Sequence, residues 1–90
     1  MNDLEIFRTE IDEIDKKLID NLSMRFMLAQ KIWKYKDENK MPPFQPERWQ
    51  QVLKSRKSYW KEKWIEERFI DEMWEVIHKY SLEMEIIWKS

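Results

Sequence analysis

The chain has 90 residues, 42% hydrophobic and 39% charged, with a formal net charge of −1. This length predicts one domain, the balanced charge disfavours a dedicated nucleic-acid binder, and the apolar content is too high for a disordered chain. The lack of cysteine excludes disulfides and thiolate metal sites, and the lack of glycine excludes glycine-rich phosphate loops and disfavours hairpin-rich sheets. Because no apolar run approaches a membrane span or a signal peptide, we expect a cytoplasmic, all-α protein.

The N-terminal part of the chain predicts one very long helix, over residues 3–39. Asn2, with Glu5 three residues later, resembles a capping box at its start. Apolar residues then recur with the spacing of a heptad seam, at Leu4, Phe7, Ile11, Ile14, Leu18, Leu28, Ile32 and Tyr35. Such a helix is about 55 Å long, whereas a compact chain of this size has a radius of gyration of about 12 Å. We therefore expect a second copy to cover the overhanging apolar face in a two-fold dimer.

The rest of the chain predicts two shorter helices after a loop. All three prolines, Pro42, Pro43 and Pro46, lie within five positions and mark the break. Pro46 occupies the first turn that proline favours, and the second helix is expected over residues 46–61. A third helix is expected over residues 66–88. The sequence thus indicates a single domain, residues 1–90, with three helices.

Arg25 interrupts the apolar seam of the first helix. A charge there costs several kcal/mol unless it is paired, so Arg25 either joins an interhelical ion pair or faces a cavity that receives an anion. On a helix, Ile32 and Lys36 point within about 20° of Arg25, on opposite sides. Lys36 lies about 16 Å further along the axis. The two cations share one face and could grip a small dianion.

Several polar residues of the second half are ambiguous by themselves. Ser81 and Glu85 are one helical turn apart beside the apolar stripe of the third helix. A serine at such a position is most often structural, and a glutamate is most often exposed to solvent. His78, the single histidine, has no partner at metal-ligand spacing, so we expect no metal site and interpret His78 as a surface or core residue. The basic and aromatic stretch 54–64 could bind nucleic acid, but a solvated helix end is favoured because three glutamates dilute its charge: Glu62, Glu66 and Glu67.

Taken in order, several segments resemble the all-helical (AroQ-type) chorismate mutases. They are residues 7–19, the "L-x-x-R" of residues 22–25, the "I-x-x-Y-K" of residues 32–36, the "P-E-R" of residues 46–48, and residues 77–81 followed by Glu85. The resemblance implies an intertwined homodimer of three-helix chains. It also implies conversion of chorismate to prephenate, a Claisen rearrangement in the shikimate route to phenylalanine and tyrosine, without a cofactor.

The resemblance also implies roles for individual residues. Arg8 of the partner chain and Arg25 would bind the substrate carboxylates, and Lys36 would donate to the ether oxygen, opposite Glu85. Around them, Gln45, Arg48 and Ser81 would contact substrate, and Ile32 and Val52 would form the wall. Helical geometry agrees on Arg8: it lies 17 residues before Arg25, about 25 Å away, so the two can share a ligand only across an antiparallel pair of chains.

The sequence departs from the family pattern at three positions. Gln45 stands where many members have Asp, and Trp49 where many have Glu. The resulting "Q-P-E-R-W" resembles mutases that are fused to the first enzyme of the pathway. The chain could therefore be a domain excised from such a fusion, or a partner of another shikimate-pathway enzyme. Glu85 stands where many members have Gln. Because Glu donates a hydrogen bond only when it is protonated, we expect activity to favour acidic pH.

Three other interpretations remain open at this stage. Isochorismate–pyruvate lyases share the scaffold, and the "I-H-x-Y…W" ending with Trp88 resembles them, whereas the spacing from Lys36 to Arg48 and the polar Ser81 favour a mutase. An aminodeoxychorismate mutase is a further variant. A non-catalytic helical dimerisation or regulatory module would suit six tryptophans, but it would not need cations such as Arg25 in its seam.

Overall fold

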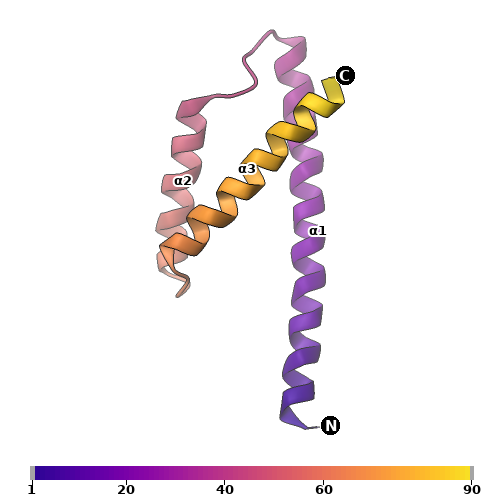
Figure 1. The fold of residues 1–90 in the computed structure, drawn as a ribbon, viewed down its shortest axis with the longest axis vertical. Coiled ribbons are helices and arrows are strands. Elements are labelled where there is room, and N and C mark those ends of the chain that lie inside the picture. Colours follow the sequence, from indigo (N-terminus) through magenta and orange to yellow (C-terminus); the bar gives the residue numbers. More distant parts are fainter. Residues whose placement is uncertain (1, 90) are drawn as a thin grey trace. The chain divides into compact units, whose positions relative to one another are not determined.

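The computed structural model describes residues 2–89, with side chains for residues 2–85, so Trp88 of the lyase-like ending lies outside the described side chains. Three helices follow one another: α1 (Asp3–Glu38), α2 (Pro46–Lys61) and α3 (Glu67–Lys89) (Figure 1). The described residues contain no strand, and the all-α class with three helices is confirmed. Among the described residues, none of the helices has an apolar stretch that could span a membrane.

Both ends of α1 follow from local hydrogen bonding. At its start, the Glu5 backbone N–H donates to Asn2 Oδ1 at 2.9 Å, which is the Asn2 half of the expected capping box. At its end, the Met41 N–H donates to the Lys36 carbonyl at 2.8 Å, and the Lys40 N–H donates to the Asp37 carbonyl at 3.3 Å. This pair of bonds is a Schellman motif. It requires a left-handed residue, and Lys40 takes that conformation with φ 54° in a chain that has no glycine.

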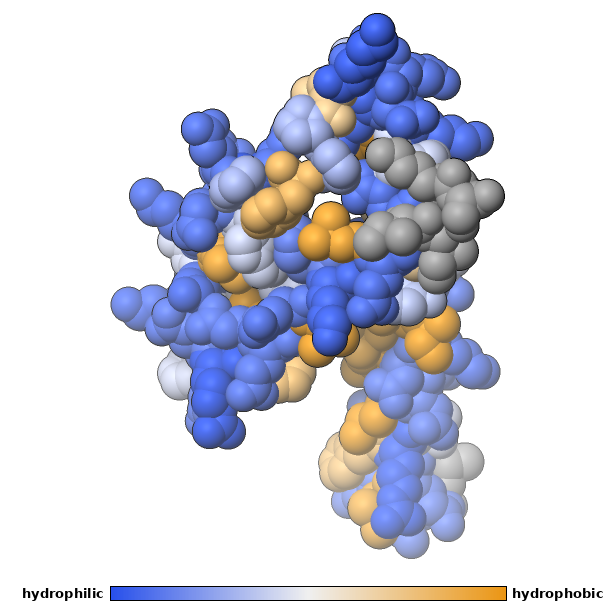
Figure 2. Space-filling view, turned by 45° about the horizontal axis from the view of Figure 1, so that its top comes forward, coloured by the Kyte–Doolittle hydropathy of each residue, from blue (hydrophilic) through white to orange (hydrophobic). Residues whose placement is uncertain are grey.

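The chain divides into two compact units, residues 1–32 and 33–90. The described part of the first unit is the N-terminal portion of α1, a helix in which no residue is buried. Apolar residues lie along this portion (Figure 2), and the exposed ones include Leu4, Phe7, Ile11, Ile14 and Leu18. The expected seam is therefore uncovered within the single chain, and the two-fold dimer stays a prediction.

The second unit is organised by the packing of α2 against α3. Its buried apolar residues are Val52 of α2 and Ile70 and Ile77 of α3. The rings of Trp60 and Trp74 meet edge to face at 5.2 Å between centroids, a favourable aromatic geometry. Since Ile70 and Ile77 are two helical turns apart, one face of α3 supplies this core.

An ion-pair cluster joins the same two helices near the turn between them. Lys57 Nζ lies 3.3 Å from Asp71 Oδ1 and 3.4 Å from Glu67 Oε1. The hydrogen bond to Asp71, and then that to Glu67, raise the pKa of Lys57 above its usual 10.5. A raised pKa means that the folded chain holds the proton more tightly. The pairs therefore stabilise the fold fully below pH 10.5, and this contribution is lost as the pH rises through the folded-state pKa.

The basic and aromatic stretch 54–64 has aromatic rings in different surroundings. Trp60 is half-buried, whereas Trp64 is 98% exposed and left-handed, with φ 62°. Lys63 Nζ lies 5.5 Å from the centroid of the exposed Tyr59 ring, a cation–π contact. Exposed cations around the end of α2 agree with a solvated helix end, the interpretation favoured by the sequence.

Replacing Lys40 with glycine should stabilise the chain. The left-handed conformation costs a residue with a β-carbon about 1–2 kcal/mol, and the extra freedom of glycine in the unfolded chain offsets part of the gain. We expect Lys40→Gly to raise the free energy of unfolding by about 0.5–1 kcal/mol, measured by urea unfolding at fixed protein concentration. The matched control, Glu38→Gly, places glycine in the last helical turn and should lower it. A Lys40→Gly variant no more stable than the wild type contradicts this account.

Candidate functional site

The residues that the sequence assigns to a site are divided between the two units. Arg8, Arg25 and Ile32 belong to the first. Lys36 and the site residues of α2 and α3 belong to the second, namely Gln45, Arg48, Val52, Ser81 and Glu85. The structure brings Gln45 and Arg48 of the second unit together.

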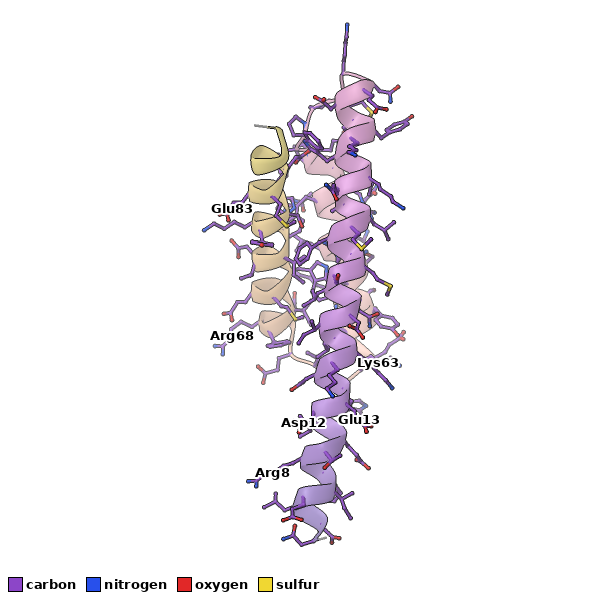
Figure 3. The ribbon with its side chains drawn as sticks, turned by 90° about the vertical axis from the view of Figure 1, so that its right-hand side faces the viewer. Arg8, Asp12, Glu13, Lys63, Arg68 and Glu83 are labelled. Carbon is purple, nitrogen blue, oxygen red and sulfur yellow. The ribbon has the colours of Figure 1, made fainter. Side chains whose placement is uncertain are left out.

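In the first unit, the two arginines differ in exposure. Arg8 is exposed and extends away from α1 (Figure 3). Arg25 is half-buried in the interrupted seam, and Ile32 is 56% exposed. Arg8 and Arg25 lie 17 residues apart on one continuous helix, which separates them by about 25 Å along the axis. A single chain therefore cannot direct both arginines at one small ligand.

Lys36 stands where α1 ends and the proline-rich loop begins. Its Nζ donates a hydrogen bond to the Pro43 carbonyl at 2.8 Å, and its own carbonyl accepts from Met41. The side chain is half-buried. An ammonium group has three N–H donors, so this bond leaves two for a ligand while fixing the position of the charge. Neither bond was predicted from the sequence.

The N-terminal turn of α2 lines an open hollow of about 500 Å³. Two of the expected residues, Gln45 and Arg48, meet here, together with Pro46, Glu47 and Gln51. Gln45 has the extended backbone, φ −117°, that a residue before proline favours, and its side chain does not cap the helix. Glu47 and Gln51 were missed by the sequence analysis, although their spacing puts them on one helical face with Arg48.

On α3, Ser81 and Glu85 follow the core residue Ile77 at one-turn intervals. The Ser81 hydroxyl donates to the Ile77 carbonyl at 2.8 Å, so its oxygen lone pairs are directed away from that bond and can accept. Glu85 is only 7% exposed, which is unusual for a carboxylic acid, because burial disfavours the charged form. Val52 of α2 is also buried, at 6% exposure.

An aromatic cluster that the sequence analysis did not anticipate surrounds His78. Its ring stacks on Trp49 with centroids 4.0 Å apart and planes at 18°, and Phe44 lies 5.5 Å away at 54°. His78 is half-buried. Their positions in the sequence could have indicated that Trp49 and His78 lie near the site, because Trp49 directly follows Arg48 and His78 comes one helical turn before Ser81. The general interpretation of His78 as a surface or core residue missed this contact between helices.

The chemistry of these groups is binding and hydrogen bonding. They offer cations for carboxylates, an ammonium as donor, a hydroxyl as acceptor, and a buried carboxyl group that donates only when it is protonated. Across residues 2–85, no cluster of three or more His, Cys, Asp or Glu side chains is arranged as a metal site. Such a set can orient a small anionic molecule and stabilise charge that develops on it.

Comparisons with known proteins identify the family. The model of a family described as chorismate mutase type II matches residues 7–86. Neither the curated proteins nor the solved structures gave a match. The matched range includes every residue that the sequence assigns to the site, from Arg8 to Glu85. Because the match extends over most of its length, the chain belongs to the chorismate mutase type II family.

Proposed function

We propose that the chain converts chorismate to prephenate. The observation that carries the proposal is the family match over residues 7–86. In this rearrangement the ether C–O bond breaks while a C–C bond forms within one molecule, so nothing is added and no proton is exchanged. A site therefore accelerates it by holding the compact conformer of the substrate and by stabilising the negative charge that grows on the ether oxygen.

Lys36 is the proposed donor to the ether oxygen. Its ammonium is held by the Pro43 carbonyl at 2.8 Å, and such a donor needs little rearrangement when the charge develops. Ser81 is the proposed acceptor for the ring hydroxyl of the substrate, since the Ser81 proton is donated to Ile77. Gln45 and Arg48, which together line one hollow, are also proposed to bind the substrate. Ile32 and Val52 are proposed to lie against the substrate ring.

The substrate carboxylates are assigned to Arg25 and to Arg8 of a partner chain, in an intertwined two-fold dimer. Two observations support this assignment. Arg8 and Arg25 lie too far apart along α1 to meet one small ligand in a single chain. The N-terminal portion of α1 also exposes an apolar stripe that includes Phe7, Ile11 and Ile14, and a second copy would cover it.

Mixed dimers test whether Arg8 and Arg25 of one site come from different chains. Arg8→Ala and Arg25→Ala should each lower kcat/KM for chorismate by at least about 100-fold, because each removes a charge-assisted bond to a carboxylate. A heterodimer of the two variants, purified through different tags, contains one site with both arginines. We expect it to recover about half of the wild-type activity, measured as prephenate formation.

The control for that experiment is Arg68→Ala, which removes an exposed cation of α3 that pairs only loosely with Glu72, at 3.9 Å. It should leave the rate unchanged. A heterodimer as inactive as its parents would contradict the assignment of Arg8 to the partner. Single variants that keep full activity would contradict carboxylate binding by these arginines.

Glu85 should make the reaction depend on pH. In its protonated form Glu85 can donate to the ether oxygen opposite Lys36, and its burial at 7% exposure disfavours the charged form. We expect kcat/KM to be higher at pH 5 than at pH 7.5 and to fall as Glu85 loses its proton. Glu85→Gln, a permanent donor, should extend activity to higher pH. A wild-type profile that is flat between about pH 5 and pH 8 would contradict this role.

A further inference from the structure

We infer that His78 is a positioning residue, which holds the first turn of α2, with Arg48, against the face of α3 that carries Ser81 and Glu85. Its effect on catalysis rests on the function proposed above. Its effect on the structure does not, and the two can be measured separately. His78 itself is assigned no contact with substrate.

Three segments of the second unit meet at this one imidazole. The loop contributes Phe44, whose ring centroid lies 5.5 Å from that of His78. The first turn of α2 contributes Trp49, stacked at 4.0 Å with planes only 18° apart. The loop is also fixed on its other side, because Lys36 donates to the neighbouring Pro43 carbonyl. The stack therefore joins both the loop and the helix start to α3.

The first turn of α2 gains from such support because its N-cap residue supplies no side-chain hydrogen bond. The N-cap residue, Gln45, makes no side-chain bond to the helix, although such a bond commonly stabilises the first turn. The first backbone bond of α2 runs from the Trp49 N–H to the Gln45 carbonyl, at 3.2 Å. A turn without a side-chain cap frays readily, and packing by Trp49 on His78 opposes that fraying.

The positions along each helix connect this stack to the proposed site. On α2, Trp49 directly follows Arg48, and both are in the turn that lines the hollow with Gln45. On α3, His78 precedes Ser81 by three residues and Glu85 by seven, which places the three on one helical face. Among the other described links between α2 and α3, the buried Val52 lies three residues beyond Trp49, and Lys57 and Trp60 lie 8 or more residues beyond it. Lys57 and Trp60 do not hold the first turn of α2 directly.

Two substitutions at His78 separate positioning from simple packing loss. His78→Ala removes the stacking surface, and we expect KM for chorismate to rise about 10-fold while kcat falls less than about 3-fold, because Arg48 contributes to binding in both ground and transition states. His78→Phe keeps a flat ring and should restore KM to within about twofold of the wild type. Lys79→Ala, an exposed neighbour on the same helix, is the matched control and should change neither constant.

Amide hydrogen exchange gives a readout that needs no turnover. We expect His78→Ala to speed exchange by at least about 10-fold at residues 49–51, whose amides donate the first backbone bonds of α2, since local opening sets this rate. His78→Phe should restore protection there, and residues 58–61 at the other end of α2 should be unaffected. If His78→Ala does not fold, Trp49→Leu interrupts the same stack from α2 and should give the same exchange pattern.

The outcomes separate this inference from the proposed function. Unchanged exchange at residues 49–51 in the folded His78→Ala variant overturns it, and so does a His78→Phe variant that restores neither exchange nor KM, because the imidazole would then act through its nitrogens. If the wild type does not convert chorismate, the proposed function fails, and the exchange comparison alone decides whether His78 positions the first turn of α2.

Discussion

The packing of α2 against α3 is the contact on which the second unit depends. Val52, Ile70 and Ile77 form its buried apolar core, and contacts with polar side chains support it at two places along α2. Lys57 pairs with Asp71 and Glu67 towards the C-terminal end of α2, while Trp49 stacks on His78 at the N-terminal end. This arrangement fixes the relative positions of Arg48 on α2 and of Ser81 and Glu85 on α3.

The first unit depends on a different constraint. The described part of α1 before Trp33 is a helix with exposed apolar residues and no buried one. A helix without a packed face gains little from propensity alone, so its stability requires a covering surface. The proposed dimer would satisfy this requirement and would also supply Arg8 to a site that one chain leaves incomplete. Folding and substrate binding would then share one interface.

The fold followed from local signals in the sequence. Asn2, the heptad spacing after Leu4, the proline cluster and Pro46 predicted the helices and the loop between α1 and α2, because helix starts and breaks depend on nearby residues. The site was less predictable. The bond between Lys36 and Pro43 and the stack of His78 on Trp49 depend on how the loop and α3 fold back on their neighbours, which helical spacing does not report.

The backbone conformation after two of the helices was also not predictable from the sequence. Lys40 and Trp64 adopt positive φ shortly after the ends of α1 and α2, and Lys40 does so at the position that glycine usually occupies in a Schellman motif. A chain without glycine gives no signal of where its left-handed residues lie. The departures from the family pattern were more informative, because one of them, Trp49, stacks on His78 of α3.

The most direct test of the central claim is to incubate the purified protein with chorismate and, separately, with isochorismate, and to identify each product by chromatography. The account predicts that chorismate is consumed with formation of prephenate and that isochorismate releases no pyruvate. Pyruvate release from isochorismate without reaction of chorismate would contradict the mutase assignment in favour of a lyase. No reaction with either substrate would contradict catalysis by this chain.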